Sequence, residues 1–147
     1  MATSYTIGHK PLDDDHDRMI AAWRELEGSR TLEAAKAAAA VLMAEAGEHF
    51  AREEMFMLQC GYPDRVRHMA LHAEMASGLR RVLLSPLMGG SPHDDFVLAV
   101  RSLMDKWVMV HILGEDAKLA PYARAHAAHA AHGLAVNGRR AAAGARL

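Results

Sequence analysis

Residues 49–57 of the chain, HFAREEMFM, decide how the rest of the sequence is interpreted. The apolar residues Phe50, Phe56 and Met57 are typical of a buried helix face, yet His49 and Glu53 lie four residues apart among them. Residues at positions i and i+4 share one face of a helix. Because buried polar groups need partners, this pair indicates either a buried ion pair or a metal site.

The helix that carries this stretch has clear ends in the sequence. Thr31 is a good N-cap residue, and the following segment to about Leu58 is rich in residues that favour helix. Gly61 suits a C-terminal turn, and Pro63 cannot continue a helix. Similar spacing and punctuation elsewhere predict three more helices. The four expected helices cover about residues 13–28, 32–58, 65–84 and 93–119.

Three helix boundaries rest on particular residue types. Any of Asp13, Asp14 and Asp15 can cap the first helix. The stretch SPLMGGSP, residues 85–92, predicts a loop before the fourth helix. That fourth helix is expected to end before Pro121, because proline disrupts a helix interior.

These elements predict an all-α fold. Four long amphipathic helices with short connections are typical of an up-down-up-down four-helix bundle, here over residues 1–122 with a short N-terminal arm. Residues 123–147 are rich in Ala, His and Arg, and we expect a tail with at most a short helix followed by disorder. Its histidines His126, His129 and His132 could share a metal ion, although an exposed tail is the favoured interpretation.

Composition excludes several classes of protein. The formal net charge is -1, which does not favour a nucleic-acid partner. No apolar run reaches the roughly 20 residues of a membrane span, and the N-terminus does not have the pattern of a secretory signal. A single cysteine, Cys60, fits a reducing compartment. We therefore expect a cytoplasmic, single-domain protein.

Histidine is the unusual feature of the composition, with ten copies in the chain. Besides His49, His68 and His72 lie four residues apart on the expected third helix. His16 lies in the first expected helix, and His111 lies deep in the fourth. Every helix thus contributes at least one histidine. A metal is the favoured explanation, because imidazole and carboxylate groups are usual ligands of first-row metals.

The stretch HILGED, residues 111–116, offers two carboxylates near His111. A regular helix brings Glu115, at i+4, onto the face of His111. A π-type turn, which bonds i to i+5, brings Asp116 round instead, and Gly114 would ease that distortion. Helix geometry alone leaves both residues open as ligands.

The order of these residues resembles the hemerythrins, and the bacteriohemerythrins in particular. Accessory features agree: Tyr5 near the N-terminus, a Tyr-Pro pair after the second helix, and W-x-x-x-HI before the last ligand. The resemblance runs from about Tyr5 to Tyr122. The matching motif residues are His16, His49, Glu53, His68, His72, His111 and Asp116.

The resemblance implies two non-heme iron ions joined by an oxo or hydroxo bridge. Three histidines of the third and fourth helices would bind one iron, and His16 and His49 would bind the other. Glu53 and Asp116 would bridge the two ions, which selects Asp116 over Glu115. The iron with two histidines would then have one open coordination position, where hemerythrins bind O2.

A pocket around that open position is expected to be apolar, so that water is excluded. The candidates, chosen by their spacing from the ligands, are Met19, Ile20, Phe50, Leu103 and Trp107. Ordinary core packing would give the same spacing. Glu54 and Glu115 are expected to be exposed neighbours of the bridging carboxylates.

The expected function is reversible O2 binding for storage, transport or delivery, with an oxygen-consuming enzyme as a possible partner, rather than enzymatic activity. The alternatives are a di-iron peroxidase, oxidase or NO-reactive enzyme, and an O2 or redox sensor. Sensor versions are normally fused to a signalling domain, which this chain lacks. An apolar open site favours O2 binding.

Overall fold

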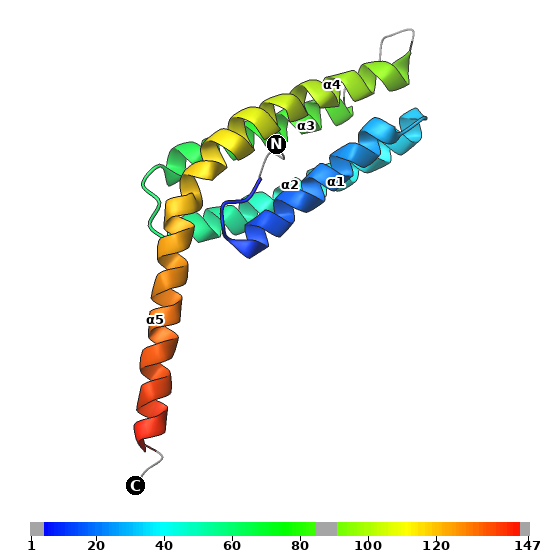
Figure 1. Ribbon diagram of the computed structural model, residues 1–147. Coiled ribbons are helices and arrows are strands. Elements are labelled where there is room, and N and C mark those ends of the chain that lie inside the picture. Colours follow the sequence, from blue (N-terminus) through cyan, green and yellow to red (C-terminus); the bar gives the residue numbers. More distant parts are fainter. Residues whose placement is uncertain (1–4, 85–90, 145–147) are drawn as a thin grey trace.

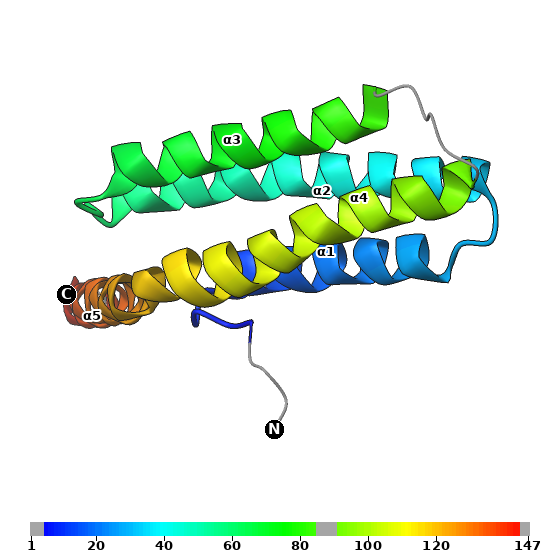
Figure 2. The ribbon, with the colours of Figure 1, turned by 90° about the horizontal axis from the view of Figure 1, so that it is seen from above.

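The computed structural model describes residues 5–84 and 91–144, including the side chains up to residue 132. Within these residues the fold is entirely helical, which confirms the predicted all-α bundle. The four bundle helices run side by side (Figures 1 and 2). They are α1 (Lys10–Gly28), α2 (Leu32–Gln59), α3 (Arg65–Leu84) and α4 (Pro92–Lys106). Most of the loop expected at residues 85–92 lies outside the described residues.

Helix α1 begins at Lys10, earlier than expected. The expectation that Asp13, Asp14 or Asp15 caps it is therefore wrong. A proline in the first turn is tolerated there, because the first N–H groups of a helix have no partner within it. Asp13 instead holds the N-terminal arm, since its Oδ1 accepts a hydrogen bond of 2.7 Å from the backbone N–H of Ile7.

Helix α2 has the ends that the sequence predicts. The Thr31 hydroxyl oxygen accepts a 3.1 Å hydrogen bond from the backbone N–H of Ala34. At the other end, Gly61 has a φ of 68°, in the left-handed region that favours glycine. The backbone N–H of Tyr62 then donates to the carbonyl of Met57 at 2.9 Å, as in a Schellman motif. Both ends of the helix that carries His49 and Glu53 are thus fixed.

The fourth helix changes its winding instead of ending. After α4 come a π-helix, η1 (Trp107–Glu115), a short 3₁₀ segment, η2 (Asp116–Leu119), and then α5 (Ala120–Gly144). The expected end before Pro121 is wrong: this proline lies in the first turn of α5, where its missing N–H costs little. Helix α5 is longer than the short helix expected and extends away from the bundle (Figure 1).

Buried apolar side chains form two clusters. The larger one, which includes Leu42 and Phe96, fills the bundle toward the α1–α2 connection. The smaller one, which includes Leu12, Met57 and Leu119, lies where α2 ends and α5 begins. The space between these two clusters is where the polar side chains of the four helices meet.

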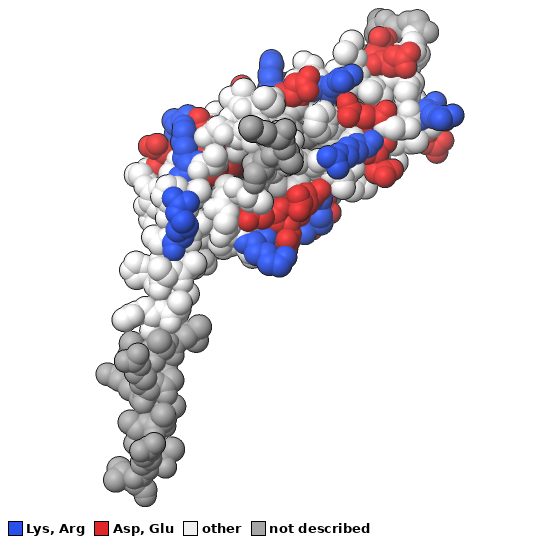
Figure 3. All heavy atoms as spheres, in the orientation of Figure 1, with Lys and Arg blue, Asp and Glu red and all other residues white. Residues whose placement is uncertain are grey.

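The surface of the bundle carries both signs of charge. Acidic and basic side chains are intermixed over the face seen in Figure 3. Among the described residues, no helix is both long enough and apolar enough to cross a membrane.

Candidate metal centre

A buried layer of polar side chains separates the two apolar clusters. On α1, His16 lies between Leu12 of the smaller cluster and Met19 of the larger one. On α2, His49 and Glu53 lie between Ala46 of the larger cluster and Met57 of the smaller one. All three polar side chains are fully buried. The amphipathic pattern of each helix therefore aims both apolar and polar groups inward, and the polar ones meet in a single layer.

The structure brings all seven motif residues together in two adjoining groups. Within each group the ligand atoms lie within 4.8 Å of one another, and every member is buried. Asp116 belongs to both groups. One group comprises Glu53, His68, His72, His111 and Asp116; the other comprises His16, His49 and Asp116.

Asp116 stands between the two groups because its two oxygens face opposite ways. Its Oδ2 is 3.2 Å from Nε2 of His16. Its Oδ1 is 3.1 Å from Nε2 of His68 and 3.0 Å from Nε2 of His111. A carboxylate in this position can contact two metal ions at once.

Glu53 occupies a comparable place on the opposite helix. Its Oε2 is 3.0 Å from Nε2 of both His68 and His72. The same oxygen is 3.9 Å from Nε2 of His49, which belongs to the other group. Glu53 is thus closer to one group but within reach of both.

The π-helix decides which carboxylate of the HILGED stretch enters the site. The backbone N–H of Asp116 donates to the carbonyl of His111, an i to i+5 bond that turns Asp116 inward. The π-type winding extends over nine residues, more than the single turn considered from sequence. Glu115 lies outside the site and pairs with Arg67 and, at 2.9 Å, with Lys118. It is partly buried, not exposed as expected.

Groups behind the histidines hold two of the rings in place. Nδ1 of His16 donates to the backbone carbonyl of Tyr5 at 2.6 Å, and Nδ1 of His72 donates to Oε1 of Glu54 at 3.0 Å. With Nδ1 protonated, each ring presents the lone pair of Nε2 to the centre. The expectation that Glu54 is merely an exposed neighbour is wrong, since it is partly buried and holds His72.

Asp15, expected as a candidate cap of the first helix, lies instead beside the polar layer. Its side chain is only 1% exposed, and its Oδ2 is 3.7 Å from Nδ1 of His49. Although burial would raise its pKa, contacts with His49 and Arg52 lower it to about 2. A signal was present in the sequence: the spacing of Leu12, Asp15 and Met19 places this aspartate on the buried face of α1.

Opposite charges balance within the polar layer. Burial would lower the pKa values of His49 and His68, but the nearby carboxylates raise both to about 9. Burial would likewise raise the pKa of Asp116, yet four neighbouring histidines hold it well below its usual value. Burial and the nearby carboxylate of Asp116 would raise the pKa of Glu53, but its close contacts with His68 and His72 help to lower it. The carboxylates are therefore ionised and able to bind cations.

Hydrogen bonds within the protein do not satisfy this layer. Several of the contacts described above are short but do not have the geometry of a hydrogen bond. Across the described part of the chain, five buried atoms that face the centre make no hydrogen bond: Nε2 of His49, His72 and His111, Oε1 of Glu53, and Oδ1 of Asp116. Buried polar atoms nearly always have partners in native proteins. Five such atoms, all imidazole nitrogens or carboxylate oxygens converging on one region, are the donor set of a metal centre.

Apolar and aromatic side chains enclose the layer. The ring of Phe50 stacks on His72 with 4.1 Å between centroids, and it is 5.4 Å from the ring of Trp107. Met19 and Ile20 are buried in the helical turn after His16. These four residues of the expected pocket therefore pack in the core beside the polar layer.

Leu103, the fifth residue of the expected pocket, lines a cavity of about 550 Å³ between α3 and the α4–η1 segment. Trp107 and His111 line the same cavity. It therefore reaches the group that contains three histidines, rather than the group formed around His16 and His49.

Together, these features define a class of protein: a four-helix bundle with a buried histidine–carboxylate metal centre. The chain belongs to the hemerythrin family, because residues 8–123 match the hemerythrin HHE cation binding domain. It is also similar to a bacteriohemerythrin of Stenotrophomonas maltophilia (strain R551-3). The two are 27% identical over 124 residues, which cover 82% of this chain and 78% of the relative. The resemblance noted in the sequence is thereby confirmed.

Proposed function

We propose that this protein binds O2 reversibly at two non-heme iron ions in the buried polar layer. The observation that carries the proposal is the arrangement of seven buried ligands in two groups that share Asp116. Family membership supports a cation-binding domain and a small-molecule ligand. It also supports a binding protein rather than an enzyme.

The ligand roles follow the arrangement of the family. His68, His72 and His111 would hold one iron, and the two histidines of α1 and α2 would hold the other. Glu53 and Asp116 would bridge them, together with an oxo or hydroxo group. The oxygens of Asp116, which face different histidines, support this assignment. When bound, two ferrous ions supply one open coordination position and a reversible two-electron exchange with O2.

The chain's own residues would make the binding reversible by keeping the site dry. Phe50 covers one face of His72, and Trp107 packs behind Phe50. Met19 and Ile20 fill the core beside His16, and Leu103 lines the cavity near His111. Excluding water limits the proton supply that would oxidise the site irreversibly.

The physiological role would be oxygen storage, transport or delivery to an oxygen-consuming enzyme. A small bundle with one buried centre suits this role, because the ligand is a diatomic molecule and needs little space. We place this function in the cytoplasm, where the single cysteine of the chain would stay reduced.

The test is to load the protein with ferrous iron under argon, add air, and record the visible spectrum. We expect a charge-transfer band that forms within the mixing time and disappears when O2 is removed. Protein loaded with zinc serves as the control and should show no band. Absence of the band, or its decay to the ferric form before O2 can be removed, contradicts reversible binding. Sustained consumption of peroxide with a reductant would favour the peroxidase alternative.

A further inference from the structure

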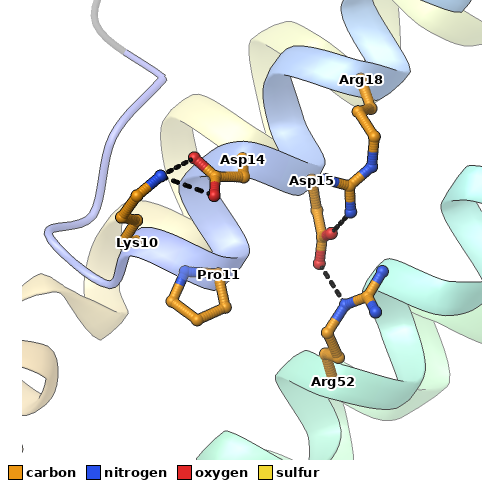
Figure 4. A pocket seen from close by; sticks show the side chains of 6 residues that line it. All are labelled: Lys10, Pro11, Asp14, Asp15, Arg18 and Arg52. Carbon is orange, nitrogen blue, oxygen red and sulfur yellow. Dashed lines mark hydrogen bonds and ion pairs between the residues drawn. The ribbon is translucent and has the colours of Figure 1, made fainter.

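One buried carboxylate near the centre is not among its seven ligands. Asp15 follows Leu12 by three residues on the inner face of α1 and is 1% exposed. It also lines a surface cavity of about 380 Å³ formed between α1 and α2 (Figure 4). Asp15 therefore lies between the solvent-facing cavity and the polar layer.

Two arginines hold this carboxylate from the solvent side. Nε of Arg52 is 2.8 Å from Oδ2 of Asp15, and Arg18 pairs with the other oxygen (Figure 4). Each arginine is itself held by a glutamate of α2: Arg18 by Glu45 and Arg52 by Glu48, both at 2.9 Å. A buried charge is tolerated only when it is paired in this way. The network fixes the position of Asp15 between the two helices.

On its inner side, Asp15 faces the back of a ligand. Nδ1 of His49 is 3.7 Å from Oδ2 of Asp15, while Nε2 of His49 faces Asp116 at 3.8 Å. A metal bound through Nε2 requires the proton on Nδ1. Two other ligands already show such a backing group, the carbonyl of Tyr5 and the carboxylate of Glu54.

We propose that Asp15 is the positioning residue of His49. Asp15 accepts a hydrogen bond from the Nδ1–H of His49 and so aims Nε2 at the metal of the two-histidine group. The distance of 3.7 Å exceeds that of a hydrogen bond, so the proposal requires the imidazole of His49 to approach Asp15 when the metal binds. The proposal rests on the metal centre proposed above. Because the ligand that Asp15 faces belongs to the two-histidine group, its influence is confined to the half of the site that has the open position.

The matched control is one residue away. Asp14 lines the same cavity and carries the same charge, but it pairs with Lys10, at 2.8 Å, on the solvent side (Figure 4). We would compare Asp15→Ala and Asp15→Asn with Asp14→Asn, in full-length protein loaded with ferrous iron under argon. The measurements are iron per chain and the rate at which a chelator removes each iron.

We expect Asp15→Ala to lose one of two irons about 10–100-fold faster than the wild type, as is usual when a group behind a metal-bound histidine is removed. Asp15→Asn keeps an acceptor oxygen, so its rate of iron loss should lie between those of the wild type and Asp15→Ala. Asp14→Asn should behave as the wild type. The second iron should leave at the same rate in all four proteins, which a general loss of folding would not produce.

A second readout does not involve iron. In zinc-loaded protein with ¹⁵N-labelled histidine, the Nδ1–H resonance of His49 should shift in Asp15→Asn, and those of the other ligands should not. Equal acceleration of both irons, or an unshifted resonance, overturns the role of Asp15. A wild-type chain that never holds two irons overturns the proposed function and this inference together.

Discussion

Both halves of the site depend on Asp116, because its oxygens face histidines of different groups. We predict that Asp116→Ala or Glu53→Ala lowers the iron content from two ions toward one per chain, measured by elemental analysis. Glu115→Ala is the control: that residue pairs with Arg67 outside the site and should leave two ions bound. Two tightly held ions in both bridging variants would contradict the ligand assignment.

The charges of the layer predict how pH acts on protein stripped of metal. The pKa values of His49 and His68 are raised from 6.5 to about 9 in the folded chain. Their contribution to stability is fully present below the unfolded value of 6.5 and is lost as pH rises through about 9. Thermal unfolding with chelator should therefore show a falling midpoint from about pH 7 to about pH 10. The unfolding midpoint of iron-loaded protein should fall less over the same pH range. Equal pH dependence of the midpoint in both forms would contradict the assigned charges.

At the scale of the helices, the turn after α2 is fixed by the backbone of Gly61. Its φ of 68° strains any residue with a Cβ, so Gly61→Ala should lower the free energy of unfolding by about 1–2 kcal/mol. Gly47, within the same helix, has an ordinary φ and enough open space beside it for a methyl group. Gly47→Ala should raise stability by about 0.5–1 kcal/mol. Denaturant titration measures the free energy of unfolding of both variants. A decrease in both would contradict this interpretation.

The sequence predicts the end of a helix correctly where residues next to that end determine it. Thr31 and Gly61 act on their own neighbours, so both ends of α2 were predictable. The start of α1 differs from the prediction because the helix already begins at Lys10, which leaves Asp13 to bond the N-terminal arm. Pro121 by itself predicts the end of a helix, but the π and 3₁₀ segments before it place it in the first turn of α5.

At the scale of the whole molecule, helical spacing predicted six of the seven motif residues as candidates, and the resemblance to the hemerythrins was needed to select Asp116 over Glu115. Their meeting in one layer follows from the bundle. The groups behind the histidines were not predictable in the same way. Spacing places Asp15 on the buried face of α1, but only the packing of α1 and α3 against α2 reveals that Asp15 and Glu54 each face a histidine of the layer.

The tail can be tested as a unit. Ala123 is buried in the smaller cluster, whereas residues 124–132 are exposed. His126 still contacts the bundle, with its ring 5.6 Å from that of Phe56. A chain ending after residue 126 should therefore keep two irons and unfold within about 0.5 kcal/mol of the full chain, as surface changes usually do. Elemental analysis and denaturant titration provide the check. Loss of an iron on truncation would show that the centre depends on α5.

The polar layer between two apolar clusters also bears on how the bundle unfolds. Over the residues that the structure describes, the two clusters are separate, and the histidines and carboxylates of the polar layer join the four helices between them. Bound metal would then make the two ends of the bundle a single cooperative unit. Stripped of metal, amide protons around the smaller cluster should exchange with solvent before those around the larger one, as an independent local opening.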